Sequence, residues 1–134
     1  MKLTQKAKVS DASLSLLFPT LAVDDSGNVG IGASGFSKSQ APSVYLFTHL
    51  TTDPAGQMNG PFLAHAGSQS YSCDKGRQAD HAPVGWGTYS ATVQDGSDRM
   101  KLWTLQEYGG SATPCVWKTR VIGFQPEAKR AKGE

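Results

Sequence analysis

Five side chains in two acidic segments carry the oxygen atoms that a divalent cation would need. Asp24, Asp25 and Asn28 come close together in VDDSGN, and Asp95 and Asp98 do so in QDGSD. Carboxylate and amide oxygens are the ligands that calcium prefers. The spacing matches no EF-hand loop, however, and Asp and Asn in tight turns usually bond to their own backbone. We expect these residues to be structural, with a calcium site at Asp24, Asp25 and Asn28 as the alternative.

Aromatic side chains offer a second kind of chemistry, the stacking of sugar rings. Trp86 and Tyr89 lie at the start of a segment that we expect to be a strand. The faces of aromatic rings suit the apolar faces of pyranoses, and the same rings can instead pack between sheets. Trp86 and Tyr89 are therefore the candidate ligand-binding residues, with a glycan as the ligand and simple packing as the alternative.

The chain has two cysteines, Cys73 and Cys115. An even count permits one disulfide, which would close a loop of about 43 residues and add roughly 4 kcal/mol in the chain-entropy model. The alternative is two buried free thiols. A bridge would fit an oxidising compartment. Two cysteines are too few for a zinc cluster, and the three histidines show no metal-ligand spacing, so we expect no cofactor.

Composition and charge narrow the class of protein. A length of 134 residues predicts one domain. Thirteen basic residues nearly balance 11 acidic ones, with several of the basic ones near the chain ends, so we expect no nucleic-acid-binding face. No segment approaches the ~20 apolar residues of a membrane span, and residues 1–18 lack the apolar core of a signal peptide. Fifteen glycines and abundant Ser and Thr favour an all-β fold.

Strands are the elements that must position these side chains. Alternation of residue types predicts strands at 18–24, 29–34, 43–50, 62–66, 88–93, 101–108 and 116–124. Residues 1–17 are expected to hold the remnant of an outer strand (2–9) and a linker. Residues 51–86 form an irregular insert within the main unit of 18–124, and the basic tail 125–134 is expected to be disordered.

The chain also contains an internal repeat. LAVDDSG placed over ATVQDGS aligns Asp25 with Asp95 at an offset of 70 residues. Both copies run through a strand of small residues, an acidic turn, a more hydrophobic strand and a third strand. Asp25 with Gly27, and Asp95 with Gly96, are the expected structural turn residues.

This order of elements favours antiparallel sheets that form about two blades of an incomplete β-propeller. The innermost strand of a blade is crowded near the axis and suits small residues, whereas outer strands have room for aromatic ones. Closed propellers have four or more blades, so two blades alone leave exposed edges and an uncovered apolar face. A free-standing β-sandwich is the alternative.

The sequence resembles a known family in these same segments. FPTLAVDDSGNVGIGASG and GWGTYSATVQDGSDRMKLWTLQEYG, followed by WKTRVIGF, resemble the last blades of secreted bacterial proteins of the sialidase-like, Asp-box (BNR-repeat) β-propeller superfamily. The resemblance covers roughly residues 18–124. Asp25 and Gly27 supply the Asp-x-Gly core of an Asp-box. Val23 stands where Ser or Thr is expected, and Gly30 where an aromatic residue is expected.

The resemblance implies the kind of site that sialidases have. There, three arginines bind the substrate carboxylate beside a Tyr–Glu pair and an acidic proton donor. A guanidinium can pair with a carboxylate through two hydrogen bonds. The four arginines of this chain suggest no convergent triad: they are Arg77, Arg99, Arg120 and Arg130. Glu107 and Tyr108 are adjacent, so in a strand they point to opposite faces. We therefore expect no catalytic residue in this chain.

The first functional hypothesis is a non-catalytic β-propeller segment of an extracellular or cell-surface bacterial protein, with a structural or binding role. The alternative is the C-terminal fragment of a sialidase-type glycoside hydrolase whose catalytic residues are missing from this chain, and a third hypothesis is an independent carbohydrate-binding sandwich. The expected partners are the remaining blades of a larger parent chain, other copies bound through exposed blade edges, and a glycan. Met1 would then be an internal start.

Overall fold

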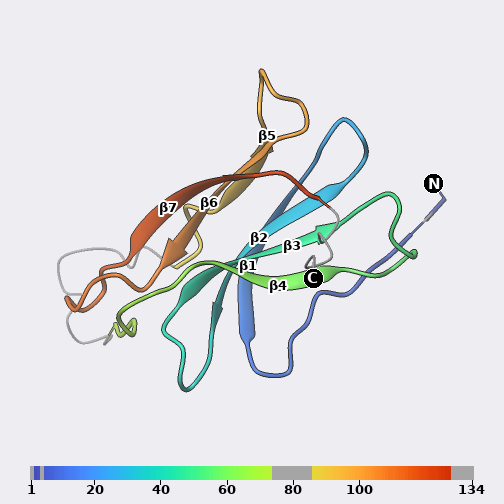
Figure 1. The fold of residues 1–134 in the computed structure, drawn as a ribbon. Coiled ribbons are helices and arrows are strands. Elements are labelled where there is room, and N and C mark those ends of the chain that lie inside the picture. The colour runs from blue at the N-terminus through green and yellow to red at the C-terminus, as the bar shows by residue number, and fades with distance from the viewer. Residues whose placement is uncertain (1, 4, 74–85, 128–134) are drawn as a thin grey trace, which may run out of the picture.

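The computed structural model describes residues 2–3, 5–73 and 86–127, and within them the fold consists of strands and loops without helices (Figure 1). The strands are β1 (Ser15–Val23), β2 (Val29–Phe36), β3 (Ser43–His49), β4 (Asn59–His65), β5 (Ala91–Gln94), β6 (Leu102–Tyr108) and β7 (Lys118–Phe124). They form two antiparallel sheets, one with the order β1-β2-β3-β4 and one with the order β5-β6-β7. The expected all-β fold is confirmed.

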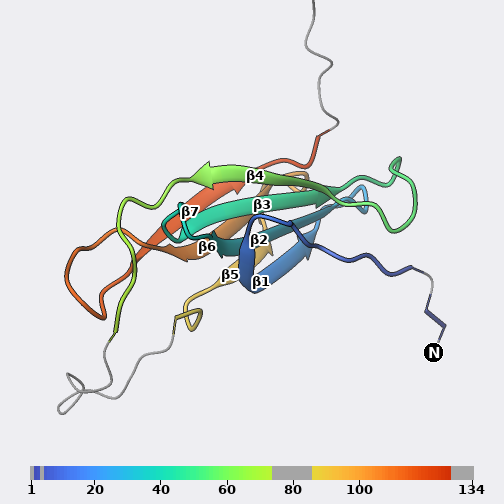
Figure 2. The same cartoon turned by 90° about the horizontal axis from the view of Figure 1, so that it is seen from below.

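The two sheets lie face to face and share the same strand order. Figure 2 shows β4, β3, β2 and β1 following one another in the same sense as β7, β6 and β5. Midway along the first strands, the hydroxyl oxygens of Thr20 and Thr92 lie 2.7 Å apart, and in the turns that follow, the Asp25 amide donates to the Arg99 carbonyl. β1 and β5 therefore run in the same direction. This arrangement is consistent with partial propeller blades and with a sandwich.

Glycines on β2 allow the two sheets to approach closely. A Cβ atom on Gly30 would lie 2.7 Å from the ring of Phe124, and one on Gly32 would lie 2.8 Å from Nε2 of Gln106. Both glycines alternate with larger residues in β2, so only one face of this strand is small. We call the two faces that meet here the inner faces.

The outer face of the four-stranded sheet is partly covered by the N-terminal segment. Ala33, Tyr45 and Phe47 form a buried cluster there, against which Val9 and Leu14 pack. Part of this face stays open, because the side chain of Leu21 is 61% exposed. A hollow of about 650 Å³ lies between the N-terminal segment and this face.

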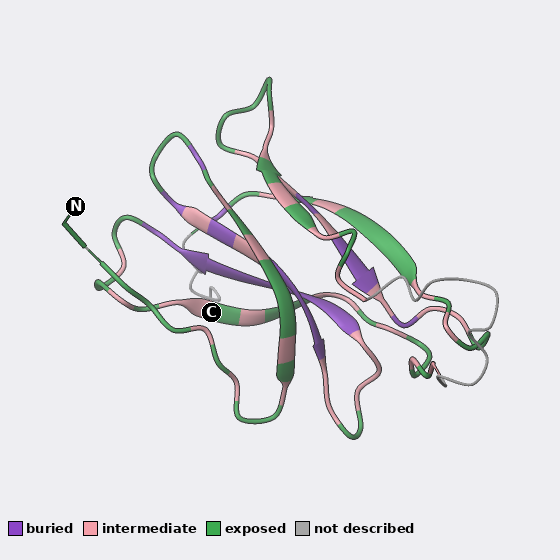
Figure 3. Cartoon of the chain, turned by 180° about the vertical axis from the view of Figure 1, so that it is seen from behind, coloured by how far each residue is buried: buried purple, intermediate pink, exposed green. Residues whose placement is uncertain are grey.

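The outer face of the three-stranded sheet carries apolar side chains that no described segment covers fully. Val93 on β5 is 54% exposed and Val121 on β7 is 58% exposed. Figure 3 shows that burial is concentrated in β2, β3 and β6, the strands that have a neighbouring strand on each side, while β7 is largely exposed. Apolar residues are therefore left open on both sides of the stack.

Residues 2–9 do not form the expected strand in the part that the structure describes. The segment lies across a sheet face, because Val9 packs on the buried cluster and Gln5 Nε2 lies 3.1 Å from Nε2 of His49. The boundary expected after residue 17 is also wrong, since β1 begins at Ser15. β4 lies within the expected insert. Residues 125–127 are not in a strand, and the rest of the expected tail lies outside the described residues.

The repeat is shifted by one residue from the expected alignment. The amide of Asp24 donates to the Asn28 carbonyl to close the turn after β1, and the amide of Asp95 donates to the Lys101 carbonyl to close the turn after β5. Asp24, not Asp25, is therefore the counterpart of Asp95. The sequence alignment missed this because the second turn is longer.

Candidate functional site

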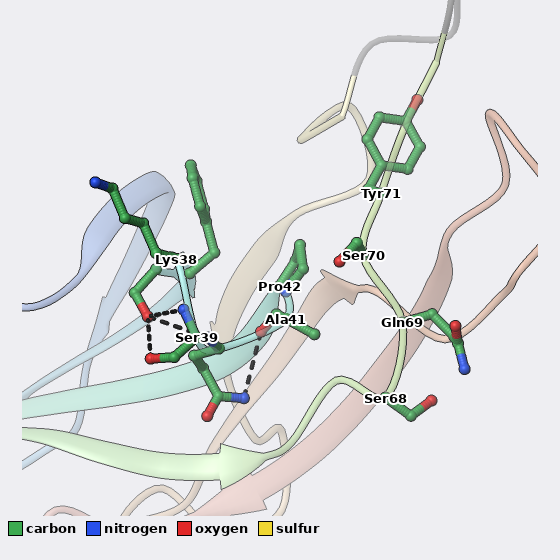
Figure 4. A pocket seen from close by; sticks show the side chains of 11 residues that line it. Lys38, Ser39, Ala41, Pro42, Ser68, Gln69, Ser70 and Tyr71 are labelled. Carbon is green, nitrogen blue, oxygen red and sulfur yellow. Dashed lines mark hydrogen bonds between the residues drawn. The ribbon is translucent and has the colours of Figure 1, made fainter.

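A groove lies at the end of the stack where β1 and β3 begin and β2 ends. Its outer part, of about 410 Å³, lies between the loop of residues 37–42 and the segment of residues 68–71 (Figure 4). Its inner part, of about 210 Å³, lies between Leu17 and Ser34 of the four-stranded sheet and the side chain of Trp86. The two parts share Phe36, Pro42 and Tyr71 in their walls. We refer to both parts together as the groove.

Trp86 and Tyr71 form an aromatic wall of the groove. Their rings meet edge to face with centroids 4.9 Å apart, and Trp117 adjoins both rings. The indole Nε1 of Trp86 donates to the hydroxyl of Ser34 over 3.2 Å, and that buried hydroxyl donates to the Glu107 carbonyl. The ring of Trp86 is thus fixed by packing on one side and by a hydrogen bond on the other.

The Glu107 carboxylate positions the turn that carries Trp86. Glu107 is fully buried, and its carboxylate accepts hydrogen bonds from the amides of Gly87 (2.6 Å) and Tyr89 (3.1 Å). Gly87 adopts a positive φ of 96°, which favours glycine. Its α-carbon also faces the ring of Phe18, where a side chain would collide. Glu107 is therefore a positioning residue for this turn.

The segment opposite the 37–42 loop is held at both ends. The amides of Ser68 and Gln69 donate to the Gly109 carbonyl, and the Gly109 amide donates to the Pro42 carbonyl. Beyond Tyr71, the structure joins Cys73 to Cys115 in a disulfide, one of the two states that the sequence left open. Both walls of the groove are therefore tied to the strands.

Of the two aromatic candidates from the sequence, only Trp86 lines the groove. Tyr89 is 52% exposed and is absent from the groove walls. Sequence reasoning missed Tyr71, which lies in the insert that lacked periodicity. The signal that could have identified Tyr71 is its position two residues before Cys73, because the bridge to Cys115 brings Tyr71 near Trp117.

The acidic turn after β1 uses its oxygen atoms internally. Asp24 accepts from the amides of Ser26 and Asn28 with one oxygen and from the Asn28 side chain with the other. The Asn28 side-chain oxygen accepts from the amide of Thr51. Gly27 has a positive φ of 84° in this turn. Among the described residues, no group of three or more His, Cys, Asp and Glu side chains could hold a metal ion.

Three acidic candidates remain, and of these Asp98 accepts from the amide of Met100 and from the side chain of Gln125. Asp25 accepts from the side chain of Gln94 and forms an exposed ion pair with Arg99, and these contacts hold its pKa below the usual value. Asp95 accepts from the amides of Asp98 and Ser97 and from the Trp103 indole.

The backbone bond from Asp98, followed by the Trp103 and Ser97 bonds, holds the pKa of Asp95 well below its usual value. Gly96, next to it, has open space around its α-carbon. The turn after β5 is thus built around the Asp95 carboxylate.

The residues that a sialidase-type mechanism would need are not brought together in the described part of the chain. Arg99 is paired with Asp25, and Arg120 lies in β7 with an exposed side chain. Arg77 and Arg130 lie outside the described residues. Glu107 holds the Trp86 turn, whereas the Tyr108 ring packs edge-on against His65 with centroids 4.4 Å apart.

In the described ranges, no helix is long and apolar enough to cross a membrane. Comparison with family models, with curated proteins and with solved structures gave no match to this chain.

Proposed function

We propose that this chain is a pair of β-propeller-type blades with a non-catalytic, structural role in an extracellular or cell-surface protein, and that further blades cover its outer faces. The observation that carries this proposal is the combination of two sheets with the same strand order and direction and apolar side chains open on both outer sides. Sheets that repeat in this sense are related by a rotation, as successive blades are.

The position of the contacts between the sheets supports a radial arrangement. β1 lies against β5 and β2 lies against β6, whereas contact between the third strands, β3 and β7, is sparse. Sheets that diverge from their first strands outward fit around an axis beside β1 and β5. The small residues on the inner face of β2, Gly30 and Gly32, fit the crowding expected near such an axis.

The repeat also indicates what covers the outer face of the three-stranded sheet. Because Asp24 is the counterpart of Asp95, Val93 in β5 corresponds to Ala22 in β1. Ala22 lies on the inner face of the four-stranded sheet, which the three-stranded sheet covers. By this correspondence the face that carries Val93 and Val121 would also be covered by a sheet. We therefore expect another blade to cover this surface, and that blade comes either from a longer parent chain or from a second copy of this chain.

The proposed compartment rests on the disulfide. A bridge between Cys73 and Cys115 persists in oxidising surroundings, which favours an extracellular or cell-surface location. The sialidase-type alternative gains no support from the described residues, because Arg99 is engaged by Asp25 and no second arginine accompanies it.

Sedimentation equilibrium tests the proposal. The isolated chain is expected to associate as its concentration rises, because two copies can supply the missing cover to each other. Val93→Lys with Val121→Lys should abolish this association, whereas Thr52→Lys, in the exposed β3–β4 loop, adds the same type of charge and should not. A chain that stays monomeric at every concentration, with or without these substitutions, would contradict the proposal.

A further inference from the structure

We propose that the groove binds a neutral saccharide, with a pyranose ring against the aromatic wall of Tyr71 and Trp86 and with sugar hydroxyls bonded to the serine and glutamine side chains of the rim. This goes beyond the structural role proposed above and does not depend on it. The groove lies at the end of the stack, whereas the outer faces that further blades would cover lie on its sides.

The inner part of the groove is apolar and aromatic. Its walls come from Leu17, Phe36, Pro42, Tyr71 and Trp86, with the Ser34 hydroxyl as the polar group among them. That hydroxyl is already bonded to the Trp86 indole and to a backbone carbonyl. Ligand sites typically combine such apolar and aromatic walls with a few convergent polar groups. The inner part therefore suits the apolar face of a ring rather than a charged group.

The outer part of the groove is polar and almost uncharged. Hydroxyl and amide side chains predominate on its two sides (Figure 4), from Ser37, Ser39, Gln40, Ser68, Gln69 and Ser70. Lys38 is the charged residue in this lining, and no carboxylate occurs among the described residues that form it. Hydroxyl and amide groups both donate and accept hydrogen bonds, as sugar hydroxyls do. Among the described lining residues, a single cation gives no two-armed clamp for an acidic ligand.

The rim is held in one shape before any ligand binds. The Ser37 hydroxyl accepts from the amides of Ser39 and Gln40, and the Gln40 side-chain amide donates to the buried Ser43 hydroxyl over 2.9 Å. The Ser43 hydroxyl also accepts from the amide of Gly67, at the start of the opposite segment. Ser43 therefore links both sides of the groove. A site whose polar groups are already ordered loses less entropy on binding.

The charge and polarity of the groove favour a neutral saccharide over other small ligands. A nucleotide or an acidic sugar would bring negative charge to a rim with Lys38 as its lone cation among the described lining residues. A purely apolar ligand would leave the rim hydroxyls facing it without partners, which is costly for polar groups removed from water. A neutral ring with one apolar face and hydroxyls at its edge satisfies both parts of the groove.

Titration with cellohexaose, maltohexaose and chitohexaose tests the proposal. Binding is followed by the tryptophan fluorescence of Trp86 together with Trp103 and Trp117, and by amide chemical shifts of residues 37–42 and 68–71. At least one of these three probes is expected to bind with a Kd at or below about 1 mM. Tyr71→Ala should weaken binding by about tenfold, as loss of a central aromatic contact does. Tyr89→Ala, which removes an exposed ring outside the groove, should leave the Kd unchanged.

Two further variants keep the result interpretable. Ser70→Ala removes a rim hydroxyl and is expected to weaken binding without altering the fold, in case Tyr71→Ala disturbs the segment before the disulfide. The titration is repeated on the Val93→Lys, Val121→Lys protein, in which blade association is removed while the groove is intact. If a saccharide binds this variant, and neither the variant nor the wild type associates, the saccharide site stands and the proposed covering by further blades is wrong.

Three outcomes would overturn the saccharide site. The first is that none of the neutral probes binds. The second is that binding leaves the amides of residues 37–42 and 68–71 unshifted, or weakens equally with Tyr89→Ala. The third is that an oligogalacturonate, tested in parallel, binds more tightly than every neutral probe, since the groove would then select acidic sugars.

Discussion

Thr20 of β1 and Thr92 of β5 meet across the space between the two sheets, with their hydroxyl oxygens 2.7 Å apart. Thr92 also contacts the hydroxyl of Thr104 at 2.9 Å, and the side-chain amide of Gln106 donates to Thr20 and Thr104. These four side chains form a connected polar network on the inner faces. A network of this kind fits one register between the sheets and is left unsatisfied by others.

Replacing one member of this network should lower stability. Thr92→Val preserves the shape of the side chain but leaves the Thr20 and Thr104 hydroxyls without a partner that they have in the native protein. The expected cost is about 1–3 kcal/mol in the free energy of unfolding, measured by urea denaturation. Thr119→Val, at an exposed position of β7, is the matched control and should change it by less than about 0.5 kcal/mol. Equal changes in the free energy of unfolding for Thr92→Val and Thr119→Val would show that the polar network does not stabilise the fold.

The close approach of the sheets at Gly32 gives a second prediction. Gly32→Ala places a methyl group against Thr104 and 2.8 Å from Nε2 of Gln106, so these side chains must move. Overpacking of this kind costs about 1–3 kcal/mol, and thermal unfolding should show it as a lower Tm. Gly96→Ala has open space around the new methyl group and serves as the control. An unchanged Tm for Gly32→Ala would mean that the sheets are further apart than described.

The carboxylate of Asp95 predicts a dependence of stability on pH. Its backbone bond from Asp98, with the Trp103 and Ser97 bonds, holds its pKa below the value of about 3.9 in unfolded chains. The stabilisation is therefore fully present above about pH 4 and is lost as the pH falls through the lower pKa of the folded state. Asp95→Asn removes this part of the acid sensitivity.

The test of this prediction is urea unfolding of both proteins between about pH 2 and pH 7. The difference in unfolding free energy between wild type and Asp95→Asn should be constant above about pH 4 and should shrink below it. A difference that grows as the pH falls has the wrong sign and would exclude a lowered pKa at Asp95.

The disulfide should stabilise both the fold and the groove. Cys73 and Cys115 lie 42 residues apart in the sequence, and a loop of this length corresponds to about 4 kcal/mol in the chain-entropy model. Cys73→Ala with Cys115→Ala is expected to lower the unfolding free energy by up to that amount and to shift the tryptophan emission of the Trp86 and Trp117 cluster. Treatment of the native protein with a reductant should reproduce both changes, and the double variant should be insensitive to it.

The strands could be predicted from sequence because their pattern is local. Alternating residues placed the seven described strands within a few positions of their observed bounds, and Gly27, two residues after Asp25, marked the turn after β1. The prediction of a strand at residues 2–9 was wrong for a related reason. Its alternation is typical of a strand, but Val9 finds its apolar partners on the face of a sheet rather than at an edge.

The groove could be predicted only in part, because its contacts join distant segments. Trp86 was identified from its residue type, but Tyr71 and Ser34 are 15 and 52 residues away from it in the chain. No periodicity connects such positions. The one-residue error in the repeat has a similar origin, because the longer turn after Asp95 obscured the correspondence of Asp24 with Asp95.

The central claim is that further sheets cover Val93 and Val121 on one side of the stack and Leu21 on the other. Hydroxyl-radical footprinting of the associated protein measures this most directly, because it reports the solvent access of each side chain. The account predicts that these three side chains are oxidised several times more slowly in the associated protein than in the same protein diluted to its monomer, while exposed Tyr89 reacts equally in both. Equal oxidation of Val93, Val121 and Leu21 in associated and monomeric protein would contradict it.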